Sequence, residues 1–357
     1  MAELFIELFS EEIPAKLQID ARQKIKQMID EKLQKKEINF KSSKSFSTPK
    51  RLVFFIEGIP EKIEQKKKII KGPNVDAPQA ALDGFIKSNN LSKLDIYKKN
   101  LEKGEFYFAE TKSKVIDVLK ELQSIIPEAL QSYSWKKSMK WSAYDLSWGR
   151  PLKSIIALFN NKVINFNFFH LQSSDLTLID GTNEDKIKKI NSFKSYLSAL
   201  KSQNIILDQE KRKNIIVRKM NNICNARNLK NNFNEKLIEE VVNLVEKPNV
   251  IVGRFDEIYL KVPQEILIVT MQQHQKYFPL FDNNNKLTNL FLLVSNLADK
   301  KGYIKTGNQR VIEARLSDAK FFWDKNKTQS LVKQVAKLKN LYFFNQLGTF
   351  YDRTQRL

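Results

Sequence analysis

The hydrophobic pattern at the start of the chain predicts a strand, a helix and a second strand. The opening ELFIELF is mostly apolar and predicts a buried strand, and RLVFFIEGIP from Arg51 predicts another. Between them, SEEIPAKLQIDARQKIKQMIDEKL repeats apolar residues at helical spacing, with Leu17, Ala21, Met28 and Leu33 on one face. We expect Ser10 to cap this helix, Pro14 to lie in its first turn, and the acidic residues there to favour the positive end of its dipole.

Helices and strands continue to alternate up to residue 170. Residues 77–88 and the stretch VIDVLKELQSIIPEAL have helical spacing, whereas GEFYFAE around Phe106 has the composition of a strand. The segment IIALFNNKVINFNFF predicts a hairpin, because Asn160 and Asn161 tolerate the left-handed conformations that tight turns need.

The segment from Leu171 to Asn191 is polar and without periodicity, which predicts a loop and a domain boundary. Three helical stretches follow, the second capped by Asp208. An extended segment, a helix that begins at Pro263 and a long hairpin around the asparagines at 283–285 come next. The pattern ends with one helix at 309–323 and another from Ser330 through the Phe343 region.

These elements predict an α+β fold, in which mixed helix-sheet domains are followed by the start of a helical domain. The predicted domains are an N-terminal α+β domain at 1–170, a second α+β domain at 171–326, and the first helix of a truncated helical domain at 327–357. The second domain would contain three helices, a hairpin and the helix that carries GNQR. A length of 357 residues agrees with more than one domain.

The charge of the chain changes this picture by suggesting a partner. Lys and Arg number 61 against 40 Asp and Glu, a formal charge of +21 that attracts polyanions such as nucleic acid. An excess of Lys, Asn and Ile from AT-rich coding is the alternative explanation. The single Cys224 excludes an intrachain disulfide, and no apolar run is long enough for a signal or a membrane span. We therefore expect a cytoplasmic protein with no membrane partner.

Residues that could carry catalysis or bind a metal are sparse. The chain has only two histidines, His170 and His274, and one cysteine, so we expect no catalytic residue and no metal site. The ten glycines do not form GxGxxG, and GYIKTGNQ lacks the Lys and the Ser or Thr of a phosphate loop. KKSMK at 136–140 has the wrong order for the KMSKS loop of class I tRNA ligases.

One stretch, YSWKKSMKWSAYDLSWGRPLK, interleaves tryptophans with cations, a mixture that suits RNA because cations meet phosphates and rings stack on unpaired bases. The alternative is that the tryptophans are core residues and the lysines a solvated face. The late helix offers two further arginines, and MQQHQKYFPLF a histidine that is either structural or RNA-contacting. The candidate RNA-binding residues are Lys137, Lys140, Trp141, Arg150, His274, Lys276, Arg310 and Arg315.

Two blocks near the end, LVEKPNVIVGRFDEIYLKVPQEILIVTMQQHQKYFPLFDNNNKL and GNQRVIEARLSDAKFFWDKN, resemble the signature of bacterial glycine-tRNA ligase (glycyl-tRNA synthetase) beta subunits. FSEEIPA, STPKRL, KGP, DGF, KSMKW and WGRPLKSIIALF agree in order and spacing. Two departures stand out: NFFHLQSSDL occupies the place of a GHRF-like stretch, and the family's GNER is GNQR here, with Gln309 in place of an acid.

The resemblance implies a function that composition does not show. It implies the N-terminal half of a beta subunit that engages tRNA(Gly) and an alpha subunit in an alpha2-beta2 tetramer. ATP and Mg²⁺ would bind the alpha subunit, so this chain would bind no cofactor and perform no catalysis alone. Two alternatives stay open: an editing hydrolase that deacylates mischarged tRNA, and an interaction module that mainly holds the alpha subunit.

Overall fold

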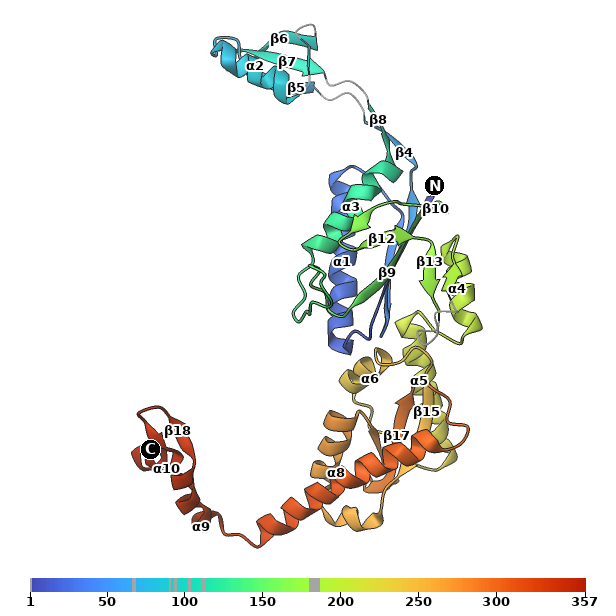
Figure 1. Ribbon diagram of the computed structural model, residues 1–357, viewed down its shortest axis with the longest axis vertical. Coiled ribbons are helices and arrows are strands. Elements are labelled where there is room, and N and C mark those ends of the chain that lie inside the picture. The colour runs from blue at the N-terminus through green and yellow to red at the C-terminus, as the bar shows by residue number, and fades with distance from the viewer. Residues whose placement is uncertain are drawn as a thin grey trace. The chain divides into compact units, whose positions relative to one another are not determined.

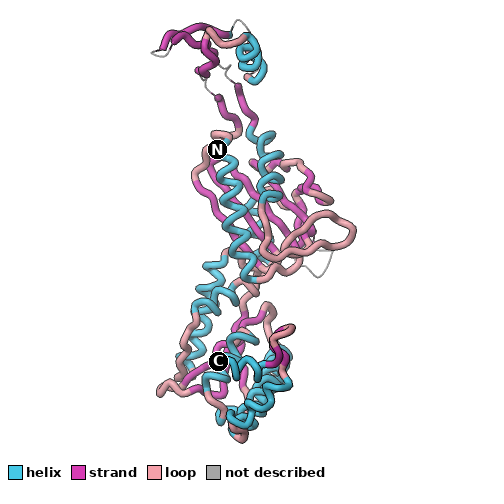
Figure 2. Tube along the Cα trace, turned by 90° about the vertical axis from the view of Figure 1, so that its left-hand side faces the viewer, coloured by secondary structure: helices cyan, strands magenta, loops and turns pink. Residues whose placement is uncertain are grey.

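The computed structural model describes residues 2–65, 69–89, 91–92, 95–101, 104–110, 114–179 and 187–357. The chain forms two compact units (Figures 1 and 2). Unit 1 comprises 1–12, 19–46 and 50–199, and unit 2 comprises 13–18, 47–49 and 200–357. Both contain helices and strands, which confirms the α+β class. None of the described helices has the length and apolar character needed to cross a membrane.

Unit 1 is built on a sheet with the order β11-β12-β9-β1-β3-β2, to which β10 adds beside β9. The predicted strands at the start and at Arg51 are confirmed as β1 and β3, which pair antiparallel with Phe5 opposite Phe55. The hairpin at Asn160 and Asn161 is confirmed between β9 and β10, and both asparagines have a positive φ. The strands are β1 (Ala2–Ser10), β2 (Ser42–Thr48), β3 (Arg51–Ile59), β9 (Leu152–Phe159), β10 (Lys162–Val163), β11 (Asn167–Phe168) and β12 (Leu171–Ser174).

The helices α1 (Ala15–Lys35) and α3 (Val118–Ser132) lie side by side over the sheet (Figures 1 and 2), and Lys32 of α1 forms an ion pair of 2.9 Å with Glu128 of α3. Three details of the prediction for α1 are wrong. Ser10 does not cap it, because Ser10 ends β1 and the helix begins at Ala15, with no acid in its first turn. Met28 is only half-buried; the buried face consists of Leu17, Ala21, Ile25, Ile29 and Leu33.

The helix α4 (Phe193–Ser202) packs on the face of the sheet that carries Phe5 and Phe55, and the Phe193 ring stacks on Phe55 at 4.0 Å. Tyr196 donates a hydrogen bond of 2.6 Å to the buried carboxylate of Glu7, which also accepts one of 3.1 Å from Arg51. These contacts explain why unit 1 continues to Ala199, whereas the sequence placed a boundary at 170/171.

The loop predicted at 171–191 is wrong where the structure describes it. Ser173 of β12 hydrogen-bonds at Phe166 and Ile164, and β12 pairs parallel with β9. The strands β13 (Leu176–Leu178) and β14 (Ile187–Lys189) form a further ribbon, and residues 180–186 lie outside the described part. Short polar strands like these lack the alternation that would reveal them in a sequence.

The segment between β3 and α3 adds two small sheets, β4-β8 and β5-β7-β6. The predicted strand GEFYFAE is confirmed as β7, and the helix expected at 77–88 is α2, from Gln79. The helix expected from Val115 starts at Val118, because the preceding residues pair with β4 and Asp117 caps the helix. The elements are β4 (Lys62–Gln65), β5 (Ile69–Asn74), α2 (Gln79–Ser88), β6 (Ile96–Leu101), β7 (Gly104–Glu110) and β8 (Lys114–Asp117).

Unit 2 contains an antiparallel sheet with the order β15-β17-β16, and helices pack on both of its faces. Its strands are β15 (Asn249–Arg254), β16 (Phe278–Phe281) and β17 (Leu287–Ser295). Alternate residues of β17 face opposite sides: Leu292 packs with α5 (Gln209–Ala226) and α6 (Glu235–Val242), and Phe291 packs with α7 (Gln264–Val269) and α8 (Tyr303–Lys327). The hairpin β16–β17 and the Asp208 cap of α5 confirm the prediction.

Residues 328–357 are mostly exposed. The helix expected from Ser330 ends at Asn340, as α9 (Leu331–Val335) followed by the 3-10 turn η5 (Ala336–Asn340). β18 (Tyr342–Phe344) then pairs with β19 (Gly348–Thr349), and α10 (Phe350–Arg356) follows with a capping box at Thr349. That this segment opens a helical domain stays a prediction.

Candidate RNA-contacting surfaces

The aromatic-basic stretch forms the connection from α3 to β9 in unit 1, and its two ends are buried. Trp135 and Trp148 meet edge to face at 5.0 Å, and Trp148 meets Phe168 at 5.7 Å. Both tryptophans are less than a tenth exposed. The interpretation of these rings as core residues is therefore correct for Trp135 and Trp148, which anchor the loop to the sheet.

Two backbone hydrogen bonds between Met139 and Trp148, of 2.8 and 3.1 Å, close residues 139–148 into a loop. We call this segment the 139–148 loop. Gly149 follows it and lies so close to the Trp135 ring that a Cβ atom would overlap the ring. The base of the loop is therefore held in place, and Leu146 within the loop is buried as well.

The cations of the stretch differ in their exposure to solvent and in whether another protein group already binds them. Lys137 and Lys140 are exposed, and among the described residues neither forms a hydrogen bond or an ion pair. Lys136 lies 3.6 Å from Asp20, and Arg150 is half-buried and donates to its neighbouring carbonyl at Gly149. Lys137 and Lys140 are thus the cations best placed to meet phosphates.

Trp141 is the one tryptophan of the stretch that remains half-exposed, and its ring is nearly perpendicular to the His170 ring, with 5.7 Å between the centroids. The Tyr144 ring stacks on the His170 ring: the planes are nearly parallel, at 7°, with 3.6 Å between the centroids. Phe169, beside His170, is 49% exposed. Sequence reasoning missed Tyr144, Phe169 and His170 as a group, because 169–170 belong to the β11–β12 turn, far from the stretch in sequence.

In unit 2, His274 and Lys276 flank the end of the π-helical turn η4 (Thr270–His274). His274 is exposed. Lys276 has a φ of 60°, forms an ion pair of 3.1 Å with Glu240, and donates to the carbonyl of Gln273. Because its charge is paired, Lys276 is a weaker candidate for phosphate than the exposed lysines of unit 1.

Arg310 and Arg315 are both exposed on α8. Five residues along an α-helix correspond to a rotation of about 140°, so the two side chains leave the helix in different directions. They do not form one cationic patch. Ile312 and Leu316 occupy the face of α8 that packs into the core.

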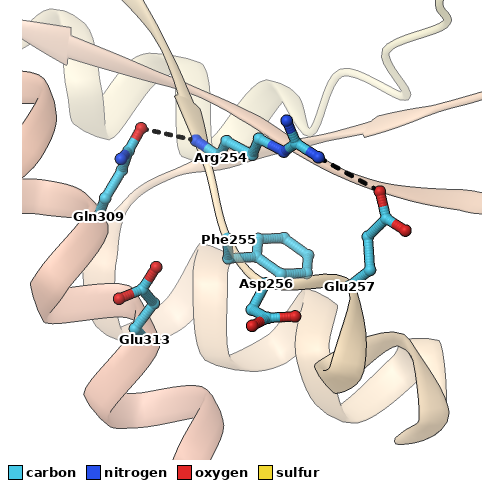
Figure 3. A pocket seen from close by; sticks show the side chains of 6 residues that line it. All are labelled: Arg254, Phe255, Asp256, Glu257, Gln309 and Glu313. Atoms are coloured by element: carbon cyan, nitrogen blue, oxygen red, sulfur yellow. Dashed lines mark hydrogen bonds and ion pairs between the residues drawn. The ribbon is translucent and has the colours of Figure 1, made fainter.

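A groove of about 490 Å³ lies between α8 and the turn after β15, lined by Arg254, Phe255, Asp256, Glu257, Gln309 and Glu313 (Figure 3). Gln309 accepts a hydrogen bond of 3.1 Å from the backbone N–H of Arg254, and the Arg254 side chain lies 3.3 Å from Glu257. Three carboxylates against one guanidinium leave the lining with an excess of two negative charges. This groove repels phosphate, so we do not assign it to RNA.

We find no candidate metal site in the described part of the chain, because no three His, Cys, Asp or Glu side chains lie close enough together to bind one metal ion. Cys224 is buried between α5 and α6, and burial raises the pKa of its thiol. A thiol with a raised pKa is a poor nucleophile.

Comparison with known proteins identifies the family of this chain. The family model described as glycyl-tRNA synthetase beta subunit matches residues 4–357. The chain belongs to the glycyl-tRNA synthetase beta subunit family. The glycine--tRNA ligase beta subunit of Rickettsia felis is 36% identical over all of this chain and 54% of its own length. Those of Rickettsia bellii and Rickettsia prowazekii are 35% identical, with the same coverage.

The resemblance drawn from the motifs is thus confirmed, and the chain spans about half the length of the beta subunits that it matches. Two of the motifs, GRFDEIYL and GNQR, meet at the groove in Figure 3. Gln309, which departs from the GNER motif expected from the sequence, accepts the Arg254 backbone N–H through its side-chain oxygen and carries no charge.

Proposed function

We propose that this chain acts as part of the beta subunit of a cytoplasmic two-subunit glycine-tRNA ligase and engages tRNA(Gly). The alpha subunit would bind ATP, Mg²⁺ and glycine and carry out the ligation, in an alpha2-beta2 tetramer. The observation that carries the proposal is the family match over residues 4–357. The relatives' name, beta subunit, implies at least one companion chain in those proteins.

Charge supports the RNA part of the proposal. A net charge of +21 favours fast capture of a polyanion. Lys140 in the 139–148 loop and Lys137 just before it are exposed cations without a partner among the described residues, and Trp135 and Trp148 are buried at the two ends of the stretch. A rigid cationic loop loses little conformational entropy when it binds.

The test combines the purified chain with the alpha subunit and tRNA(Gly). We expect gel filtration to show co-elution with the alpha subunit, and a mobility shift of the tRNA that weakens steeply as salt rises. Glycylation by the alpha subunit should increase when the chain is added. A chain that neither co-elutes nor shifts tRNA at low salt, or that activates glycine with ATP by itself, contradicts the proposal. Deacylation of mischarged tRNA would instead support an editing hydrolase.

A further inference from the structure

Three aromatic side chains from two separate segments of unit 1 are in contact, and Phe169 precedes one of them in the chain. Trp141 and Tyr144 come from the 139–148 loop, and Phe169 and His170 form the two-residue turn between β11 and β12. The Tyr144 and His170 rings are parallel with 3.6 Å between their centroids, and the Trp141 ring is nearly perpendicular to the His170 ring. We call Trp141, Tyr144, Phe169 and His170 the aromatic platform.

Two of the four side chains of the platform are exposed to solvent, and Trp141 and His170 are half-buried. Tyr144 is 42% exposed and Phe169 is 49% exposed. His170 covers one face of the Tyr144 ring in parallel, and the exposed part of Tyr144 lies on the rest of its surface. A flat ring with one supported face and one free face is the geometry on which a further planar group stacks.

The backbone beneath the platform is unusual in both segments. Phe169 has a φ of 53° and Ser142 a φ of 52°, a left-handed conformation that bulky side chains rarely adopt. The strain is held by the Phe168–Leu171 pairing of the turn and by the Met139–Trp148 bridge of the loop. Strained residues of this kind persist where the surrounding structure imposes them, and they are concentrated at ligand-binding sites.

The charges close to Trp141 and Tyr144 in the sequence indicate which planar group the platform would bind. From Ser134 to Arg150 the chain carries four cations, Lys136, Lys137, Lys140 and Arg150, and one acid, Asp145. An apolar protein partner needs no such excess, whereas a nucleotide brings a planar base and a phosphate together. Bases within a duplex are already stacked on both sides, so only an unpaired base is available.

We propose that an unpaired RNA base stacks on the free face of Tyr144, with Lys137 and Lys140 meeting the flanking phosphates. The inference rests on the proposed function and specifies it: the loop would read a single-stranded part of the RNA, not the helical stem. Phe169 would border the stacked base. His170 and Trp141 act as positioning residues, since they support the ring that the base contacts.

The experiment uses the full 357-residue chain and a short oligouridine that contains a single 2-aminopurine, whose fluorescence is quenched on stacking. We expect the wild-type chain to bind this strand with quenching and to bind the matching duplex more weakly. Tyr144→Ala should weaken binding about tenfold and abolish the quenching, whereas Tyr144→Phe, which keeps the ring, should restore both. Tyr303→Ala, at a tyrosine that is 73% exposed in unit 2, is the matched control and should change neither.

Several outcomes would overturn the inference. Unchanged quenching in Tyr144→Ala, an equal preference for duplex, or no binding of the strand by the wild-type chain would each reject the stacking site. A Tyr144→Ala variant that loses only the alpha subunit would show a protein contact instead. If tRNA(Gly) still binds and is still glycylated in these cases, the proposed function stands while the inference fails.

Discussion

The 139–148 loop of unit 1 and the groove of unit 2 both carry residues of the family motifs, but their chemistry is opposite. Lys140 in the loop and Lys137 just before it are exposed and have no partner among the described residues. The groove surrounds Arg254 with three carboxylates and a glutamine (Figure 3). A positive net charge is therefore distributed unevenly, and the sign of the local field, which decides whether phosphate is attracted, depends on which acids fold beside each cation.

The two surfaces have one structural feature in common: a buried aromatic side chain packs beneath each of them. Trp148 supports the loop and is 2% exposed; Phe255 supports the groove and is 1% exposed. Removing either ring tests whether RNA binding belongs to one surface or to the whole chain.

The largest expected effect comes from replacing the buried aromatic residue under each surface with alanine. Trp148→Ala and Phe255→Ala should each lower the free energy of unfolding by about 3–5 kcal/mol, because each leaves a large cavity. We expect only Trp148→Ala to lose RNA binding as well. Urea unfolding followed by circular dichroism gives the stability, and mobility shifts without denaturant give the affinity. Equal loss of RNA affinity in both variants would contradict the assignment of binding to unit 1.

The second prediction uses a buried tyrosine near each surface. Burial raises the pKa of Tyr277 to about 12, and its hydroxyl donates to Asn308 at 2.5 Å. Because the folded state keeps the proton that the unfolded state releases from about pH 10, stability is complete below that pH. The free energy of unfolding should fall by about 2–3 kcal/mol from this group as pH rises to 12. Tyr277→Phe should remove this part of the alkaline loss, measured by urea unfolding at each pH.

Tyr133, at the foot of the loop, sharpens the comparison. Burial raises the pKa of Tyr133, and the carboxylate of Asp20, which accepts its hydrogen bond at 2.9 Å, raises it further. The change from Tyr133→Phe should therefore exceed that from Tyr277→Phe between pH 10 and 12. A smaller change at Tyr133 would show that Asp20 does not oppose its ionisation.

The elements that the sequence predicted correctly are those with strong periodicity or a specific turn chemistry. β1 and β3 are nearly continuous apolar strands, and the Asn160–Asn161 turn uses the residues that tolerate a positive φ. The short strand β12 was missed because it pairs with β9, which is distant in the sequence, and β13 and β14 were missed because they are short and polar.

The sequence predicted which kinds of residue the candidate site contains, but not which of them are in contact. The sequence showed tryptophans alternating with lysines, yet two of those rings are buried and the exposed ring pair is Tyr144 with His170. Their contact requires the β11–β12 turn to lie against the 139–148 loop, which no local pattern encodes. Arg310 and Arg315 likewise share a helix in the sequence but point in different directions on it.

The third prediction concerns the glycine at the edge of each surface. Gly149 lies against the Trp135 ring and Gly253 against the Phe291 ring, so that an added Cβ would overlap a buried side chain in both cases. Gly149→Ala and Gly253→Ala should each cost about 1–3 kcal/mol of unfolding free energy through overpacking. We expect Gly149→Ala alone to change the 2-aminopurine quenching, because it displaces the base of the loop. Quenching altered by Gly253→Ala would link the groove to RNA.

The smallest expected effect is also the most direct comparison of the two surfaces. Lys137→Gln with Lys140→Gln removes two unpaired cations in unit 1, and Arg310→Gln with Arg315→Gln removes the same charge in unit 2. If the lysines meet phosphates of a single strand, the slope of log affinity against log salt should become shallower by about 1.4, or roughly 0.7 per contact. The arginine pair should change affinity only through net charge and leave the slope nearly unaltered. Equal slopes for the two double variants would mean that the long-range field of the chain, not the 139–148 loop, holds the RNA.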